Sequence, residues 1–322
     1  MLRYSLTRIL WLIPVIICVA FLIFALMDMA PGTVVDSMKT AEMTQEDIDT
    51  LMREYDLDKP MIYRYGKYMW GLVRGDLGKS LITGIPVWQS YISRFPKTLQ
   101  LALAALAIGI ALSIPLGIFA AKHAGTIGDN LTTVFSLLGM SMPGFWLGLL
   151  LIIWFAYKIR IFPSGYNGTL LSYVLPAISS GLAMAAITTR QVRSAVLENT
   201  RADYLRTARA KGVSERAVIN KHALGNAWIP ILTAIGANLS RSVAGSAVIE
   251  AVYSWPGVGR LTVEAVSQRD VPLVCGCVIL TSILYVVMLL LVDITYALVD
   301  PRIKSQFASV KKRRKFTRRG WS

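Results

Sequence analysis

The sequence contains little charge for its length. Of its 322 residues only 16% are Asp, Glu, Lys or Arg, whereas 54% are hydrophobic, and the mean hydropathy is +0.52. A soluble protein of this size covers its surface with more charge than that. The composition therefore excludes an ordinary soluble domain and indicates membrane spans, each of which needs about 20 apolar residues.

Residues that bind metals or carry redox chemistry are also scarce. The chain has two histidines, His123 and His222, far apart in the sequence, and three cysteines. Cys275 and Cys277 are too close for a CxxC pair, and Cys18 stands alone, so we interpret all three as small buried hydrophobic residues. We predict no metal site and no catalytic residue.

Uncharged runs of membrane-spanning length occur six times. They cover Ile9–Met27, Thr98–Ala121, Leu131–Tyr157, Leu170–Thr189, Trp228–Ile249 and Leu273–Leu291. The first run is longer than the apolar part of a signal peptide and no A-x-A site follows it, so we expect an uncleaved anchor. The predicted fold class is all-α, a polytopic membrane bundle of six transmembrane helices.

Basic residues are concentrated on one side of these runs. The N-terminus, the turn 122–130, the segment 190–227 and the tail from residue 300 carry 20 Lys and Arg but 5 Asp and Glu, which is the whole net charge of +15. Because positive loops stay in the cytoplasm, we predict that both termini are cytoplasmic. We interpret the basic tail as attracted to anionic lipid, since no nucleic-acid-binding module accompanies it.

These segments divide the chain into three predicted parts: an anchor span with an external segment (1–97), a core with cytoplasmic helices at 198–227 (98–303), and a basic tail (304–322). In the external segment, Thr44 and Asp47 resemble a capping box and predict a helix over Gln45–Tyr55. The sequence GDLGKS at Gly75–Ser80 is not a phosphate loop, because Val73 occupies the position of the required first glycine.

Two short helices joined at a glycine are predicted in the segment 190–227. Thr200 and Asp203 resemble a capping box, and Gly212 is placed to take the left-handed conformation that ends a helix. An interfacial helix pair is the alternative, but the number of caps favours a docking element. Its candidate residues are Asp203, Tyr204, Leu205, Arg206, Ala208, Ala210, Lys211, Gly212 and Ser214, with Val213 and Val218 at staple positions and Tyr204, Leu205 and Ala208 as the apolar face.

The fourth and fifth runs are rich in small and polar residues. These permit close helix packing, and lining a wet path is the alternative that stays open. The candidates for a path are Ser179, Asn238, Arg241, Ser242 and Gly245. After the fifth run, the sequence SWPGVGR predicts a tight external turn at Pro256, Gly257 and Gly259, with Trp255 at the membrane interface.

An ordered set of motifs extends nearly from end to end. It comprises Arg8 with Phe24 and Pro31-Gly32, LDKP at Leu57–Pro60, GDLGKS, RTARAKG at Arg206–Gly212, HALGNAWIP at His222–Pro230, SWPGVGR at Ser254–Arg260, and Asp300-Pro301-Arg302. Together these motifs resemble the binding-protein-dependent ABC permeases, specifically the B-type subunit of the dipeptide, oligopeptide and nickel branch. The signature of the wider superfamily is EAA, three residues, Gly, nine residues and then I-x-LP. This chain has Arg206-Thr207-Ala208 at the position of EAA and His222-Ala223-Leu224 at the position of I-x-L, a departure common in the peptide branch.

The resemblance implies a type I ABC importer permease fold in the bacterial cytoplasmic (inner) membrane. The chain would be a non-catalytic permease subunit that translocates peptides, or a related small solute such as nickel. Its implied partners are a second homologous permease, two ATPase subunits that hold ATP and Mg, and an extracytoplasmic solute-binding protein. The chain itself would need no cofactor, and its helix–Gly–helix would dock on the ATPase.

Three other classes of membrane protein compete with this interpretation. An ion-coupled secondary transporter needs ionisable relays within the membrane, but only Arg241 and, near the end of the sixth run, Asp293 are present. An intramembrane protease needs a Ser/His pair or a metal cluster at membrane depth, and neither is visible. A non-transporting scaffold would have no use for a capped docking element. The absent phosphate loop also predicts that the chain alone does not bind ATP.

Overall fold

The computed structural model describes residues 2–299 except positions 41, 201, 215–216 and 245–246. These described residues are mostly helical, and their only bridge between extended segments joins Lys79 and Pro86. In chain order the elements are α1 (Leu2–Met29), α2 (Val34–Met38), α3 (Gln45–Glu54), α4 (Met61–Val73), α5 (Val87–Lys122), α6 (Ile127–Ser141), α7 (Gly144–Leu151), η1 (Ile152–Lys158), η2 (Leu170–Tyr173), α8 (Val174–Thr200), α9 (Asp203–Ala210), η3 (Val218–Ala223), α11 (Leu224–Val243), α12 (Ala247–Val252), α13 (Val258–Ser267) and α14 (Val271–Val299).

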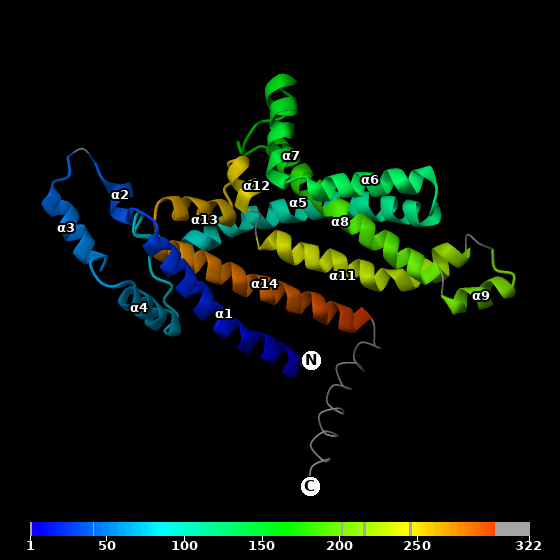
Figure 1. Ribbon diagram of the computed structural model, residues 1–322, viewed down its shortest axis with the longest axis horizontal. Helices are drawn as coiled ribbons and strands as arrows, with labels where there is room; N and C mark the ends of the chain where they lie inside the picture. The colour runs from blue at the N-terminus through cyan, green and yellow to red at the C-terminus, as the bar shows by residue number, and fades with distance from the viewer. Residues whose placement is uncertain (1, 41, 201, 215–216, 245–246, 300–322) are drawn as a thin grey trace, which may run out of the picture.

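The long helices lie alongside one another in a bundle with two distinct ends (Figure 1). Helix α9 projects from one end, which we call the α9 end. Helices α3, α4 and α13 lie at the opposite end, which we call the α13 end. The first residues of α1 and the last residues of α14 both point toward the α9 end. Predicted cytoplasmic and external segments are therefore separated along the bundle axis.

Among the described residues, four stretches are long and apolar enough to cross a membrane. They are Leu6–Met29, Val87–Lys122, Leu170–Thr200 and Val271–Thr295. These stretches correspond to the first, second, fourth and sixth uncharged runs, and they confirm the all-helical membrane bundle.

The third run is a bent pair rather than one straight helix. Helix α6 and the segment Gly144–Lys158 meet at 97°, and counting the pair as one span brings the total to five. The bend follows from Pro143, because a proline disfavours the helical conformation for the residue before it. Met142 is accordingly extended, with φ −80° and ψ 125°. Helix α7 therefore leaves the bundle sideways (Figure 1).

The fifth run, Trp228–Ile249, is divided between α11, which ends at Val243, and α12, which begins at Ala247. Within the described ranges, α11 is not among the helices that qualify as spans by length and composition. Its polar residues, including Asn226, Asn238 and Arg241, lower its apolar character. Tertiary packing rather than hydropathy therefore stabilises this helix in the bundle.

Helices α5 and α8 approach each other closely along their length, and glycines permit the approach. A Cβ added at Gly117 would lie 2.6 Å from Cβ of Val192, and one at Gly181 would lie 2.9 Å from the carbonyl oxygen of Ala105. Real Cβ atoms do not come this near to other atoms, so larger residues would push the helices apart. The two helices form the rigid centre of the bundle.

The segment between α1 and α5, which the sequence predicts to be external, begins with two capped helices. Thr33 with Asp36 and Thr44 with Asp47 each form a capping box, which starts α2 and α3. The Thr44 box confirms the cap predicted from the sequence, and α3 covers Gln45–Glu54 with Tyr55 as its C-cap. The Thr44 contacts hold the pKa of the Asp47 carboxyl below its usual value.

The GDLGKS turn is anchored to the start of α14. The Ser80 hydroxyl donates a hydrogen bond to Oδ2 of Asp270 (2.6 Å), and the Leu81 amide donates to the same oxygen (3.1 Å). The other carboxylate oxygen of the fully buried Asp270 accepts the Leu273 amide (3.2 Å) and so caps α14. This turn has a structural role at the α13 end.

Candidate functional site

The first helix of the predicted docking pair is α9. It begins after Ala202, whose backbone is extended and whose side chain provides no cap. The predicted capping box at Thr200 is wrong, because α8 extends to this residue and its hydroxyl donates to the Leu197 carbonyl (2.8 Å) within α8. Helix α8 therefore runs almost directly into α9, with only residues 201 and 202 between them.

Gly212 ends α9 as the sequence predicted. Its φ is +77°, in the left-handed region that favours glycine. The Gly212 amide donates to the Arg209 carbonyl (2.9 Å), and the Val213 amide donates to the Ala208 carbonyl (3.2 Å). These two bonds form a Schellman motif, which satisfies the last carbonyls of the helix and reverses the chain.

A small hydrophobic cluster holds α9 against η3, the second helix of the pair. Leu205, Val218 and Ala223 are all fully buried, and Ala208 and Val213 pack on them. The staple predicted between Val213 and Val218 therefore brings both residues into one cluster. We call the unit made of α9, Gly212 and η3 the helical hairpin.

The cluster corrects the predicted docking face. Leu205 is 0% exposed and Ala208 is half-buried, so these two residues stabilise the helical hairpin instead of offering it to a partner. Tyr204 is 41% exposed. The predicted docking residues that do lie on the surface are Asp203, Tyr204, Arg206, Ala210, Lys211, Gly212 and Ser214. This surface is polar and basic rather than apolar.

The start of the second helix is only partly described. The Val218 amide donates to the Ser214 carbonyl (2.9 Å), which places Ser214 at the beginning of a helical turn. A side-chain cap by Ser214 would involve positions 215–216, which lie outside the described residues. The His222 side chain also lies outside the part of the chain whose side chains are described.

The helical hairpin is attached to a packed junction of three long helices at the α9 end. Ala121 of α5, Val192 and Val196 of α8, and Ala227 and Ile231 of α11 are buried against one another. Helix α8 leads into the hairpin and α11 leads out of it. A displacement of the hairpin must therefore move the ends of these helices together.

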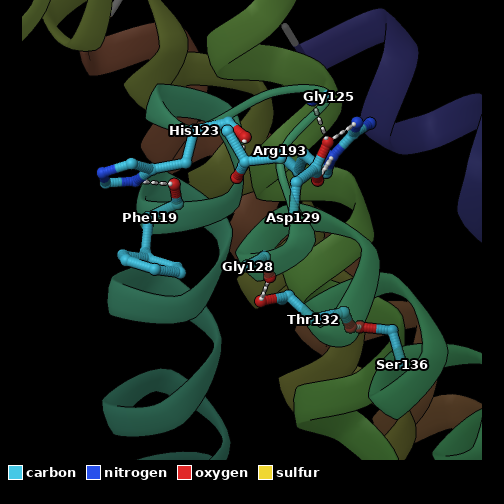
Figure 2. A network of polar contacts seen from close by, with 9 residues as sticks. Phe119, His123, Gly125, Gly128, Asp129, Thr132, Ser136 and Arg193 are labelled. Carbon is cyan, nitrogen blue, oxygen red and sulfur yellow. Dashed lines mark hydrogen bonds and ion pairs between the residues drawn. The ribbon is translucent and has the colours of Figure 1, made fainter.

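An ion pair joins the first turn of α6 to α8 at the same end (Figure 2), with Asp129 buried and Arg193 half-buried. Arg193 places Nε 2.6 Å from Oδ1 of Asp129 and Nη2 2.7 Å from Oδ2. The Gly125 amide donates to Oδ2 as well (2.9 Å). Sequence reasoning missed this pair. The available signal was a single acid, Asp129, in a turn between two uncharged runs.

Two of the predicted path residues are engaged in helix packing. The Ser179 hydroxyl lies 2.8 Å from the Tyr253 hydroxyl, and the Asn238 amide group donates to the Thr188 hydroxyl (2.8 Å). Both Ser179 and Asn238 are buried. These contacts correct the prediction that Ser179 and Asn238 line the path, because a buried polar group that already has a partner is not presented to solvent.

The remaining path candidates lie near the end of α11. Arg241 is exposed in its last turn, Ser242 is half-buried, and Gly245 lies outside the described residues. Asp293, the other charge found near an uncharged run, lies 3.0 Å from Arg8 of α1. Arg241 therefore remains the charged path candidate with a described, exposed side chain.

The SWPGVGR turn at Ser254–Arg260 is a buried structural element, not a membrane-interface anchor. Trp255 is 0% exposed, which corrects its predicted place at the interface. Its indole Nε1 donates to the Lys97 carbonyl (3.0 Å), and its ring meets Tyr166 and Tyr173 edge-on, with centroids 4.9 and 4.5 Å away. These contacts hold the turn against α5 at Lys97 and against the two tyrosines.

A buried carboxylate organises the rest of this turn. Glu250 accepts hydrogen bonds from the Thr98 hydroxyl (2.8 Å) and the Arg260 amide (3.0 Å). Burial raises its pKa above the usual value, although these donors act in the opposite direction. A Cβ at Gly257 or Gly259 would lie 2.3 or 2.9 Å from Oε2 of Glu250. The two glycines are therefore needed because the carboxylate fills the space beside them.

A cavity of about 630 Å³ lies between α1, α13, α14 and the ends of α11 and α12. Its lining is mainly apolar, with Arg8, Thr262, Thr281, Ser282 and Tyr285 as polar members. No described path candidate lines it. Across the described residues, no group of three or more His, Cys, Asp and Glu side chains is arranged to hold a metal ion.

Comparison with known families matches most of the chain. Residues 113–305 match the family described as binding-protein-dependent transport system inner membrane component. Residues 1–102 match the N-terminal region described for membrane components of the same systems. The boundary between the two matches falls within α5.

Similar proteins cover nearly the whole chain. The dipeptide transport system permease protein DppB of Escherichia coli (strain K12) is 36% identical over 94% of this chain and 99% of its own length. The oligopeptide transport system permease protein AppB of Bacillus subtilis (strain 168) is 36% identical over 94% of this chain and 100% of its own length. The glutathione transport system permease protein GsiC of Escherichia coli O6:H1 is 35% identical over 94% and 99%.

A solved structure shares the fold. A chain of the MetNI methionine ABC transporter, in an inward-facing conformation, matches with a TM-score of 0.53 and 19% identity. The match covers 66% of this chain and 97% of that chain. The matched part of the bundle therefore has the permease architecture predicted from the sequence.

Proposed function

We propose a transport role from one premise: this chain belongs to the family of binding-protein-dependent transport system inner membrane components. It is a multi-pass membrane subunit of an ATP-binding-cassette importer. In our proposal, ATP is bound and hydrolysed on separate ATPase subunits, with Mg, and this chain holds no cofactor.

The helical hairpin carries the proposal. A helix long enough to span the membrane, α8, runs into a capped unit that projects from the bundle and exposes a polar, basic face. Such a unit suits docking on a soluble protein surface. We propose that an ATPase subunit binds this face, through Tyr204, Arg206 and Lys211 in particular.

Motion of the ATPases would then act on the membrane helices. Closure of the two ATPases on ATP would displace the hairpin, and the packed junction at the α9 end would carry that displacement into α5, α8 and α11 as a rigid body. Two homologous permeases moving in this way would open the path outward, and hydrolysis would reset it. The solute-binding protein would deliver the solute at the α13 end.

We infer that the solute is a short peptide rather than nickel. The relatives described above are named for dipeptides, oligopeptides and glutathione, which is itself a tripeptide. All of these solutes carry a carboxylate. Arg241, exposed in the last turn of α11, would attract that carboxylate on the path.

Orientation follows from the charge asymmetry. The basic segments predicted as cytoplasmic include the helical hairpin and both termini. We propose that the α9 end faces the cytoplasm of a bacterial cell and that the α13 end faces outward. This orientation also places the hairpin where ATPase subunits are found.

Reconstitution tests the proposal directly. The chain, a homologous permease, two ATPase subunits and a solute-binding protein are assembled in lipid vesicles, and uptake of radiolabelled dialanine is measured. We expect co-purification of the ATPases and uptake that requires ATP. Uptake by this chain without ATPases, driven by an ion gradient, would instead identify a secondary transporter. Failure to bind any ATPase would point to a scaffold.

A further inference from the structure

The ion pair between Asp129 and Arg193 has a geometry that resists bending. Both nitrogens of one guanidinium edge face both oxygens of one carboxylate, at 2.6 and 2.7 Å. A bidentate arrangement of this kind fixes the relative orientation of the two groups, which a single contact does not. Asp129 is 2% exposed, so solvent does not compete for its oxygens.

A third contact ties the same carboxylate to the turn before α6. Gly125, whose φ is +82°, directs its amide to Oδ2 of Asp129 (2.9 Å). Figure 2 shows the carboxylate between this turn and the Arg193 side chain, with Thr132 and Ser136 following on the same helix. The carboxylate thus joins the α5–α6 turn, the first turn of α6 and the side of α8.

The position of Arg193 on α8 gives the pair its significance. Helix α8 continues without a break from Arg193 to Thr200, and α9 begins at Asp203. Any force on the helical hairpin therefore reaches Arg193 along one helix. Helix α6 has no direct connection to the hairpin in sequence. Nearer its other end, α6 contacts α8 where Gly139 faces Ala186. A Cβ added at Gly139 would lie only 2.7 Å from the Cβ of Ala186.

We propose that Asp129 and Arg193 are positioning residues for energy coupling. Their ion pair makes the α5–α6 turn and α6 move as one body with the α9 end of α8, so displacement of the hairpin also carries α6 and, through the bend at Pro143, α7. This inference rests on the proposed function, because it assumes that an ATPase moves the hairpin. It assigns α6 a role in transmission that family membership does not specify.

Three variants of the complete reconstituted complex test the proposal. Arg193→Lys keeps the positive charge but cannot form the bidentate contact. Asp129→Asn keeps the shape of the side chain but removes its negative charge. Arg190→Gln is the matched control, because Arg190 is an exposed arginine three residues earlier on the same helix. The quantity measured is radiolabelled dialanine taken up per ATP hydrolysed, beside the amount of assembled complex and its melting temperature.

We expect both pair variants to assemble and to hydrolyse ATP when the binding protein is present. Uptake per ATP should fall about fivefold or more, the lower end of the range for coupling between sites. The control should keep the ratio of the unaltered complex. A lower melting temperature with an unchanged ratio in both pair variants would overturn the proposal, since it would show a purely structural ion pair.

Two further arms keep the result interpretable. If a single variant fails to assemble, the double variant Asp129→Asn with Arg193→Gln replaces it, because this variant leaves no unpaired buried charge. In a cysteine-free background, the double variant Asp129→Cys with Arg193→Cys is cross-linked with a short bis-maleimide. We expect the cross-link to restore the uptake per ATP hydrolysed. Failure to restore it would contradict transmission between α6 and α8 at this position. Absence of ATP-driven uptake by the unaltered complex would refute the proposed function itself.

Discussion

Replacing Gly212 by valine probes the turn on which the helical hairpin depends. The native φ of +77° lies in the left-handed region, where an ordinary side chain costs about 1–2 kcal/mol and a β-branched one costs more. An added Cβ at Gly212 would have no heavy atom within 4 Å, so the substitution causes no collision. The cost is therefore backbone strain alone.

That strain is large on the scale of a conformational equilibrium. A change of about 1–2 kcal/mol alters the ratio of two states roughly 5–30-fold. The competing state is one in which α9 continues past Lys211. It would lose the bond from the Val213 amide to the Ala208 carbonyl and withdraw Val213 from the hydrophobic cluster. The exposed face of α9 would then no longer be held in its native orientation.

Uptake and ATP hydrolysis in reconstituted vesicles report the consequence. We expect Gly212→Val to insert and accumulate, because the membrane spans are untouched, but to lose dialanine uptake and to uncouple or abolish the stimulated ATPase. Gly225→Val is the matched control, since Gly225 has open space around it and lies within α11 with an ordinary helical backbone. Gly212→Asn should retain part of the activity, because asparagine tolerates this region.

The outcome that refutes this reasoning is normal uptake with normal stimulation in Gly212→Val. Residues 190–227 would then be an interfacial linker and not a docking element. A variant that fails to accumulate would instead indicate that the turn is needed for folding of the bundle.

The remaining predictions concern the chain, its orientation and its two ends. The purified subunit, free of partner chains, should show no ATP hydrolysis in a phosphate-release assay, and measurable activity would overturn its non-catalytic assignment. In intact cells and a cysteine-free background, an impermeant thiol reagent should label Lys59→Cys but not Lys211→Cys; the reverse pattern would invert the orientation. Arg241→Gln should assemble normally but lower peptide uptake roughly tenfold, the effect of losing one charge-assisted hydrogen bond, and unchanged uptake would contradict its place on the path. Gly257→Ala should displace the carboxylate of Glu250 and destabilise the subunit by about 1–3 kcal/mol, so an unchanged melting temperature would contradict the packing at this turn.

Local patterns predicted much of the fold because each depends on residues close together in the sequence. The capping box at Thr44 requires only Asp47, and the helix end at Gly212 requires only the preceding turn. Uncharged length likewise predicted the positions of α1, α5, α8 and α14. In each case the interaction is completed within one element or at its boundary.

Features that depend on distant residues were missed or misplaced. The apolar face of α9 was recognised, but periodicity does not tell which neighbour covers it, and Leu205 is buried against Val218. Trp255 was assigned to the membrane interface because nothing local indicated its hydrogen bond to the Lys97 carbonyl, 158 residues away. Asp129 and Arg193 are 64 residues apart, so their pairing also required the packed structure.

The anchor of the GDLGKS turn has a consequence for how the chain is made. Ser80 and its acceptor Asp270 are separated by 190 residues. At about 5–20 residues per second during synthesis, the acceptor emerges roughly 10–40 s after the donor. Throughout that interval the GDLGKS turn has no acceptor for the Ser80 hydroxyl. The anchor of this turn therefore forms only after Asp270 has been made, and a chain truncated before that residue would leave the Ser80 hydroxyl without its acceptor.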